Sequence, residues 1–369
     1  MLKGLLATCA ILLAPAFLLA QPLADRIPAD AIVYLGWQGS QAMPSAYANS
    51  HLKGILDASH FELLATDFLP RLAQHLRDRN PRAGQIMETL AAACGPLWRH
   101  PSALYVASFD FKAPGVRPRF AILCEAGPEA DLLLAQFKSL LQLFPQASFP
   151  LRAFKSGQLV VLTGGYDPDT QVLASPDSPT TPKSLATNPT FQHAIHQVQQ
   201  DAILLAYIDA EAALAQANEA ITKLKTPTAA NWPKFLDALG LGSFKRIVVS
   251  GGFEGRDWST QAFIAAPAPR QGLATLLESK PISDATLKLI PQAATSARVE
   301  RLDLAGLFDV ARNLAGQMDP LNQVTWDDGV TQVNQMFGFD LRQDVLEAFH
   351  NEWIFYTIPA GGTSADGDR

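Results

Sequence analysis

Short runs of apolar residues, bounded by turn residues, recur along the chain and predict β-strands. The run PADAIVYLGW at residues 28–37 is echoed by QDAILLAYID at 200–209 and more faintly by AATSARVERLDL at 293–304. Segments with the spacing of amphipathic helices follow these runs. The pattern therefore predicts that a strand leading into helices begins three times.

Paired apolar runs predict three β-hairpins. SALYVASFDF and RPRFAILCEA are joined by KAPGV, whose Pro and Gly suit a turn. SFPLRAF and QLVVLTG are joined by KSG, and FKRIVVSGGF and WSTQAFIAA are joined by EGRD. Hairpins of this kind favour antiparallel sheets.

The clearest helix is predicted over residues 129–144. Its apolar positions share one face, because they follow the i, i+4, i+7, i+8 spacing of a buried helix. These positions are Leu133, Phe137, Leu140, Leu141 and Phe144. Further helices are predicted over 51–94 with a break at Pro70, around 189–200, over 210–224, in a segment capped by Gly240, from Leu304 onward, and over 337–350.

The first twenty residues have the three-part pattern of a secretory signal peptide. Lys3 gives the positive start, an uncharged apolar run follows, and polar QPLADR comes next. We predict cleavage near Ala20 and export to the periplasm or cell envelope, with no stable transmembrane span after cleavage. The alternative is an uncleaved anchor, which the short run and Pro15 disfavour.

Residues 166–189 lose apolar periodicity and are rich in Pro, Ser, Thr and Asp. Proline interrupts both strand ladders and helices, so this stretch is the best candidate for a linker. A chain of 369 residues is long enough for two or three domains. We therefore predict a signal peptide at 1–20, a first α+β unit at 21–165, the linker at 166–189, a second α+β unit at 190–290 and a third, incomplete α+β unit at 291–369.

The predicted fold class is α+β, with repeated β-α-β-β-α modules whose mainly antiparallel sheets are covered by helices. A strand cannot bury its apolar residues alone, so each module must supply helices for one face of a sheet. The echoes lie about 90 to 170 residues apart, which is too long for a solenoid repeat. The alternative, that this common element order recurs by chance, stays open.

Composition points to a large core and argues against nucleic-acid binding. Hydrophobic residues make up 48% and charged residues 17%, below the roughly 25% typical of soluble domains. The net charge is −6, and no basic stripe that could neutralise phosphates is visible.

Cys94 and Cys124 are the two cysteines that follow the leader. Export permits a disulfide between them, while their apolar neighbourhoods are equally typical of two buried free thiols. Neither has a His or charged partner nearby in sequence, which disfavours catalytic thiol chemistry.

Other polar residues are weak candidates for chemistry. His193 and His196 are three apart on a predicted helix, but no acidic residue accompanies them, so we expect a solvated face. Asp167 and Asp169 lack the rest of a calcium loop. We therefore predict no metal site and no cofactor.

The glycine-rich stretches TGGYDPDT and SGGFEGRD do not lead into helices as phosphate loops do, so Gly164, Gly165, Gly251 and Gly252 predict hairpin turns. No G-x-S-x-G elbow is present; Ser40 follows a strand without a nearby His. The acidic pair in TWDDGV, Asp327 and Asp328, is typical of a turn.

Several segments resemble a group of exported bacterial proteins defined by a domain of unknown function, number 3352. They include IPADAIVYLGW, SLATNPTFQHAIHQV before AILLAYIDAEAAL, IPQAATSARVERLDL and FGFDLRQDVLEAFHNEWIFYTIP. The resemblance implies an exported α+β protein of several units that usually continues beyond a segment like EWIFYTIP. It brings no catalytic residue, cofactor or partner.

We therefore expect an exported, non-catalytic protein that binds, or is a structural part of, the cell envelope, with an unknown envelope protein or component as its partner. One alternative is an envelope hydrolase whose site is assembled from distant residues. The other is a carrier that holds an apolar ligand between sheet and helices.

Overall fold

The computed structural model describes residues 21–358, except 44, 61–62, 64–66, 111–116, 146, 175–182, 199–200, 225–226, 278–281 and 350. The predicted signal peptide at 1–20, with its cleavage point near Ala20, lies outside the described residues. The chain forms two compact units. Unit 1 is Met1–Ala220 with Arg246–Ala265, and unit 2 is Ile221–Lys245 with Ala266–Arg369.

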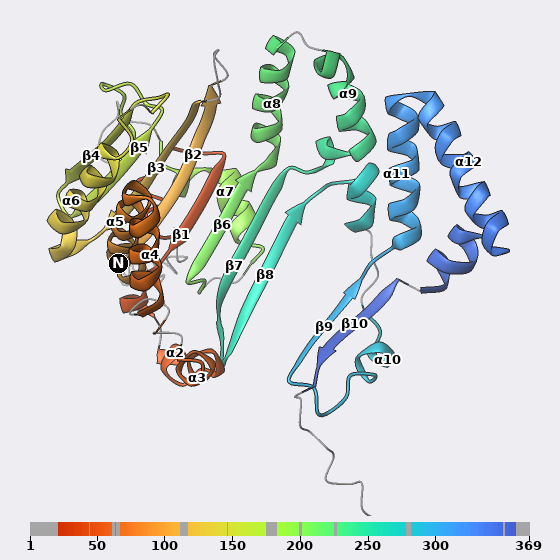
Figure 1. Ribbon diagram of the computed structural model, residues 1–369, viewed down its shortest axis with the longest axis horizontal. Helices are drawn as coiled ribbons and strands as arrows, with labels where there is room; N and C mark the ends of the chain where they lie inside the picture. The colour runs from red at the N-terminus through yellow and green to blue at the C-terminus, as the bar shows by residue number, and fades with distance from the viewer. Residues whose placement is uncertain are drawn as a thin grey trace, which may run out of the picture. The chain divides into compact units, whose positions relative to one another are not determined.

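Unit 1 is built on one eight-stranded sheet in which every neighbouring pair is antiparallel (Figure 1). Three of its connections between neighbouring strands are the predicted hairpins. The strands are β1 (Val33–Trp37), β2 (Ser102–Asp110), β3 (Arg117–Glu125), β4 (Leu151–Ser156), β5 (Leu159–Gly164), β6 (Leu204–Asp209), β7 (Arg246–Glu254) and β8 (Asp257–Ala265).

The spatial order of the strands is β4-β5-β3-β2-β1-β6-β7-β8. The central strand β1 pairs with β2 on one side and with β6 on the other, so Tyr34 lies opposite both Tyr105 and Tyr207. Because side chains alternate across a strand, these three tyrosines point to the same face of the sheet.

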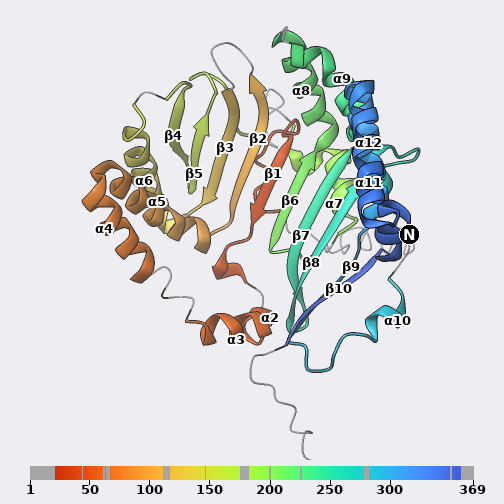
Figure 2. The same ribbon diagram turned by 45° about the vertical axis from the view of Figure 1, so that its right-hand side comes forward.

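In sequence order, the helices of unit 1 come between β1 and β2, after β3 and before β6 (Figures 1 and 2). Asn residues before Pro start two of them: Asn80 accepts hydrogen bonds from the backbone of α5, and Asn188 from that of α7. The helices are α2 (Ser45–Ala48), α3 (His51–Ala58), α4 (Leu69–Arg79), α5 (Pro81–Arg99), α6 (Ala130–Gln142) and α7 (Pro189–Ile195), with 3-10 turns η1 (Ser40–Ala42), η3 (Gly127–Glu129) and η4 (Leu185–Thr187).

Helix α8 (Ala210–Leu224) follows β6, and its last residues belong to unit 2. In unit 2, two further strands form a separate antiparallel sheet, β9 (Ser296–Arg301) and β10 (Glu352–Thr357). The helical elements of unit 2 are α9 (Pro227–Leu239), α10 (Asp284–Leu287), α11 (Leu304–Met318) and α12 (Pro320–Phe337), with 3-10 turns η5 (Leu241–Ser243), η6 (Gly272–Leu277) and η8 (Glu347–Phe349) and the π-helical turn η7 (Leu341–Leu346).

Side-chain ion pairs connect the helical elements of unit 2. Arg312 of α11 forms a bidentate pair with Asp327 of α12, with both contacts at 2.6 Å. Arg342 of η7 binds Asp309 of α11 in the same way, at 2.9 and 2.6 Å. These pairs hold the pKa values of Asp309 and Asp327 below their usual range, chiefly through the hydrogen bonds from the arginines.

The predicted α+β class and its antiparallel sheet are confirmed, while the grouping of the chain differs from the three predicted units. Strands β6, β7 and β8, predicted to open a second unit, complete the same sheet as β1–β5 because β6 pairs with β1. Of the predicted linker, Val172, Ala174 and Leu185 are buried in unit 1.

Candidate binding surface

One face of the eight-stranded sheet presents apolar side chains to the outside over its strands β1, β2, β6, β7 and β8. The strand registers place Val106, Val33, Ile208, Ile247 and Ile264 side by side in one row across these strands. The neighbouring row consists of Leu104, Leu35, Ala206, Val249 and Ala262. We call these two rows the open face.

Central strand β1 shows how unequal the two faces are. Tyr34 and Gly36 are buried, whereas Leu35 between them is 40% exposed although β1 has a strand on either side. Ile208 of β6 and Ile264 of β8 are 36% and 37% exposed on the same face. Outward-facing positions of an antiparallel sheet are usually polar, so an apolar outward row sets this face apart as a candidate interaction surface.

The same face is covered at the other end of the sheet, over β3, β4 and β5. There α5 and α6 pack on Cys124, Val160 and Leu162, which are all buried. Leu133 and Phe137 of α6, both on the stripe predicted from the sequence, are the large side chains of this contact. The prediction that Phe144 belongs to the stripe is wrong, because this residue follows the end of α6 and is exposed.

Aromatic side chains stand at the margins of the open face. On the side of α5, Trp37 stacks on Trp98 at 4.5 Å between ring centroids, and its indole N–H donates to the carbonyl of Trp98 at 2.8 Å. At the turn between β7 and β8, Phe253 packs edge-on against Trp258 at 5.3 Å and near Tyr47 of α2 at 5.8 Å. Aromatic residues are enriched at protein interfaces, which fits this position.

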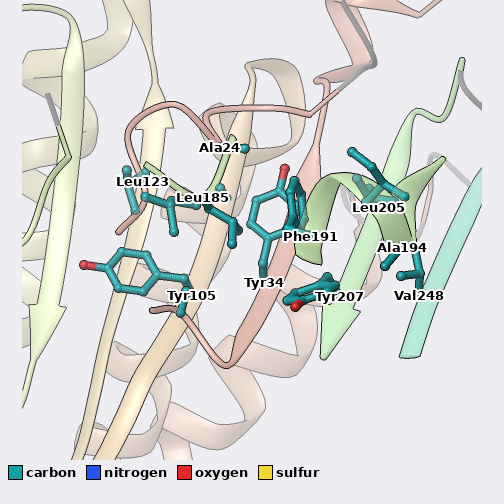
Figure 3. Close-up of a cluster of buried hydrophobic side chains, with 14 of the residues drawn as sticks. Ala24, Tyr34, Tyr105, Leu123, Leu185, Phe191, Ala194, Leu205, Tyr207 and Val248 are labelled. Atoms are coloured by element: carbon teal, nitrogen blue, oxygen red, sulfur yellow. The ribbon is translucent and has the colours of Figure 1, made fainter. Parts of the chain in front are cut away.

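The opposite face of the sheet carries the main core of unit 1. Phe191 of α7 lies between two strand tyrosines, with ring centroids 5.7 Å from Tyr34 and 5.0 Å from Tyr207 (Figure 3). Tyr34 donates to the carbonyl of Pro22 at 2.9 Å, which ties the segment after the predicted leader to the sheet. Burial raises the pKa of Tyr207 to about 12, so this phenol stays neutral and structural at physiological pH.

A cavity of about 660 Å³ lies elsewhere in unit 1, next to the β4–β5 turn. Its walls are largely polar and include Asp25, Arg26, Glu125, Gln158 and Gln171. Arg26 is already paired with Asp25 at 3.3 Å. Such walls do not suit the apolar ligand considered from the sequence, because ligand pockets of that kind are lined mainly by hydrophobic side chains.

An ionic cluster joins the end of α5 to the start of α6. Glu129 accepts from Arg99 at 2.6 Å and contacts the ring nitrogen of His100 at 2.7 Å. These hydrogen bonds lower the pKa of Glu129. Ser102 lies close by, but its hydroxyl donates to the backbone carbonyls of Leu97 and His100. The cluster is therefore an ion pair that fixes a helix–strand junction, and Ser102 is not directed toward the imidazole.

The two cysteines are free thiols. Cys124 on β3 is buried, and its thiol lies 3.8 Å from the carbonyl of Pro96; burial raises its pKa to about 11. Cys94 on α5 is exposed, so the alternative of two buried free thiols describes Cys124 only. The structure contains no bond between Cys94 and Cys124.

The polar residues considered from the sequence are not brought together. His193 and His196 are exposed, as expected for a solvated helix face, while their apolar neighbours on α7 are buried. Asp167 and Asp169 are exposed in the loop after β5. Within the described part of the chain, no group of three or more His, Cys, Asp or Glu side chains is placed to hold a metal ion.

Two predictions of turns are wrong. Gly251 and Gly252 lie inside β7. The ring of Trp258 on β8 crosses Gly251, and a Cβ at this position would come within 2.5 Å of the ring. The turn itself uses Gly255, at φ 62°. Asp327 and Asp328 lie within α12.

The hairpin turn predicted for Gly164 and Gly165 is also wrong: Gly164 is the last residue of β5, Gly165 follows it at φ 78°, and the next strand, β6, begins only at Leu204 and does not pair with β5. Ser40 begins the 3-10 turn η1 directly after β1.

The sequence did contain a signal for the open face. AIVYLGW and AILLAYI are continuously apolar rather than alternating, and strands of this kind are buried on both faces. What the sequence did not show is that the described part of unit 1 covers only one of the two faces here.

Comparisons with protein-family models, with curated proteins and with solved structures found no match for this chain. The resemblance to the exported bacterial proteins with domain 3352 therefore stays a prediction from sequence. None of the described helices is both long and apolar enough to cross a membrane.

Proposed function

We propose that this is an exported, non-catalytic binding protein of the cell envelope, whose open face receives an apolar helical surface of a partner protein. The observation that carries the proposal is the exposure of Leu35, Ile208 and Ile264 on one face of a single sheet. Removing such a surface from water contributes about 25 cal/mol per Å² of apolar area, which must offset the entropy lost on association.

Helices suit this surface in size and shape. From β2 to β8 the open face spans four strand spacings of about 4.8 Å, or about 19 Å. Two helices packed side by side at about 8–10 Å between axes cover this width. The covered half of the same face supplies the precedent, because α5 and α6 lie on it in this way.

A small apolar ligand fits the open face less well than a protein does. Carriers enclose most of the ligand surface in a cavity. The cavity described above instead has polar walls that include Asp25, Arg26 and Glu125, and it does not include residues of the open face. A broad face with aromatic margins is the form of a protein interface.

The recurring strands belong to the same proposal. The pairs β1 and β2, β6 and β7, and β9 and β10 share one pattern. In each pair, helices separate the two strands in sequence, and the two strands are neighbours in a sheet. We propose that these are copies of one module, the third of them incomplete. The comparable order of elements supports this, alongside the echoes in sequence.

The decisive experiment uses charge on the open face. Leu35→Glu and Ile208→Glu place a carboxylate on a surface that must become dry on binding, so each should weaken capture of the partner from the protein's own envelope extract at least about tenfold. Leu132→Glu is the matched control, because Leu132 is an exposed leucine of α6, away from the open face.

Circular dichroism and thermal unfolding of the three variants check that each remains folded. Equal capture by wild type, Leu35→Glu and Ile208→Glu would contradict the proposal. So would hydrolysis of an ester, peptide or glycan by the purified protein that is lost in a variant of a described polar residue, because an enzyme would then be the better description.

A further inference from the structure

Strand β9 in unit 2 has one neighbour, β10, among the described residues, and its other edge is unoccupied there. Two-stranded sheets are marginally stable in water, and an open edge offers backbone groups to another strand. Many edge strands avoid this by a proline or a bulge, but the sequence SARVER contains no proline, and its pairing with β10 is regular from Ser296 to Arg301.

The direction of the backbone groups follows from one hydrogen bond beyond the strand end. Leu302 donates to the carbonyl of Asn351 at 2.8 Å, and these residues continue the β9–β10 register. In an antiparallel ladder alternate residues bond to the same neighbour, so Arg298 and Glu300 bond to β10. The N–H and C=O groups of Ala297 and Val299 then point to the unoccupied edge.

The charges on β9 distinguish one arrangement of a second β9 strand from the others. Residues whose backbone groups face the edge can oppose only each other there. A pairing centred on Val299 places Arg298 of each copy opposite Glu300 of the other copy. This gives two pairs of opposite charge. Pairings centred on Arg298 or Glu300 instead place like charges directly opposite each other, which is destabilising.

The side chains of Arg298 and Glu300 can form these cross-strand ion pairs. Arg298 is 75% exposed on its side chain and pairs with Glu300 on its own strand at 2.5 Å. An exposed pair of this kind contributes little, so replacing it by cross-strand pairs costs little. On the other side of the strand, Val299 lies opposite Ile354 of β10, and pairing centred on Val299 doubles this into a row of four apolar side chains.

We propose that β9 pairs antiparallel with β9 of a second copy of this chain, centred on Val299, to give a four-stranded sheet in the order β10-β9-β9-β10. The same chain already contains such a pairing between comparable strands. β1 and β6 each precede helices and a further strand, as β9 does, and they pair with each other antiparallel.

Charge exchange on the full-length protein tests the proposal. Wild type should sediment as a dimer at tens of micromolar in analytical ultracentrifugation. Arg298→Glu alone and Glu300→Arg alone each create two like-charge contacts across the pair, and should raise the dimer dissociation constant at least about tenfold. The double variant Arg298→Glu/Glu300→Arg restores opposite charges and should return the wild-type constant.

Mixing the two single variants gives a further check. The Arg298→Glu copy carries carboxylates at both positions beside Val299, and the Glu300→Arg copy carries guanidinium groups at both. In a mixed pair every contact beside Val299 therefore joins opposite charges. The mixture should therefore dimerise more tightly than either single variant does alone. A monomeric wild type at these concentrations, or a dissociation constant that the single variants leave unchanged, overturns the proposal.

A cysteine placed on the two-fold axis tests the register. Hydrogen-bonded partners in an antiparallel pair have Cα atoms about 5.5 Å apart, which a disulfide can bridge. Under oxidation Val299→Cys should form a covalent dimer in high yield. Ala297→Cys is the control and keeps the same native cysteines. In the proposed register residue 297 faces residue 301 of the second copy, so two cysteines at 297 do not meet. Equal crosslinking of both variants overturns the proposed register.

Discussion

The row of side chains that passes through Leu35 is apolar along its whole length, yet one end is buried beneath helices and the other is exposed. At the β5 and β3 end, Leu162 and Ile122 lie beneath α5 and α6. At the β6 and β8 end, Ala206 is partly exposed and Ala262 is exposed. The difference teaches that one apolar pattern has two outcomes: α5 and α6 cover it at one end, and at the other end Leu35 is exposed, where we propose that a partner binds.

The largest effect is expected where the row is covered. Leu133→Ala removes a fully buried side chain between α6 and the sheet, and should lower the free energy of unfolding by about 3 kcal/mol. Leu35→Ala, the matched change on the open face, should cost less than about 1 kcal/mol, because its side chain already contacts solvent. Urea unfolding of both variants measures the difference; equal losses would show that Leu35 is as well packed as Leu133.

A smaller effect is expected in the binding of an apolar dye to the open face. The open face should bind 8-anilinonaphthalene-1-sulfonate to the folded protein, since this dye reports exposed apolar surface. Leu35→Glu should reduce the fluorescence by at least about half, while Leu132→Glu should leave it nearly unchanged. Identical spectra for both variants would place the dye elsewhere.

Acid should weaken the covered half through Glu129. Its pKa is lowered in the folded protein by Arg99 and His100, so its contribution to stability is present above the usual pKa of a glutamate and is lost as the pH falls through the lower, folded value. Glu129→Gln should lower the thermal midpoint at pH 7; the difference from wild type should shrink as the pH falls below the usual pKa of a glutamate and disappear below the lower, folded pKa. A difference that persists in acid would contradict this origin.

The smallest change concerns the thiols and should leave stability untouched. Cys94 is exposed and should react rapidly with Ellman's reagent at pH 8, whereas Cys124 is buried with a raised pKa and should react only on unfolding. Cys94→Ser should therefore remove one fast-reacting thiol per chain, and Cys124→Ser none. Rapid loss of a thiol in the first variant would mean that α5 opens readily from β3 and exposes Cys124.

Local structure could be predicted well from the sequence. The hairpin β2–β3, the stripe of Leu133 and Phe137 on α6, and the cap at Gly240 were each specified by residues close together in the chain. The helical position of Asp327 was missed because an Asp-Asp-Gly stretch has turn chemistry, and Arg312 on the neighbouring helix fixes it instead.

The arrangement of the sheet depended on contacts between distant residues. The pairing of Tyr34 with Tyr207 joins strands that the sequence assigns to different units, and no local signal specifies it. The open face was missed for the same reason. Apolar runs such as AILLAYI show that both faces need cover, but whether a helix of the chain provides it depends on the three-dimensional path.

The pairing of β1 with β6 also sets the order in which the protein can fold. β1 (Val33–Trp37) is synthesised well before β6, yet one of its edges is satisfied only by residues 204–209. Until then one edge of an apolar strand stays unpaired, a state prone to aggregation. Such distant pairing slows folding, so newly made chains should depend on a chaperone that shields the first strand.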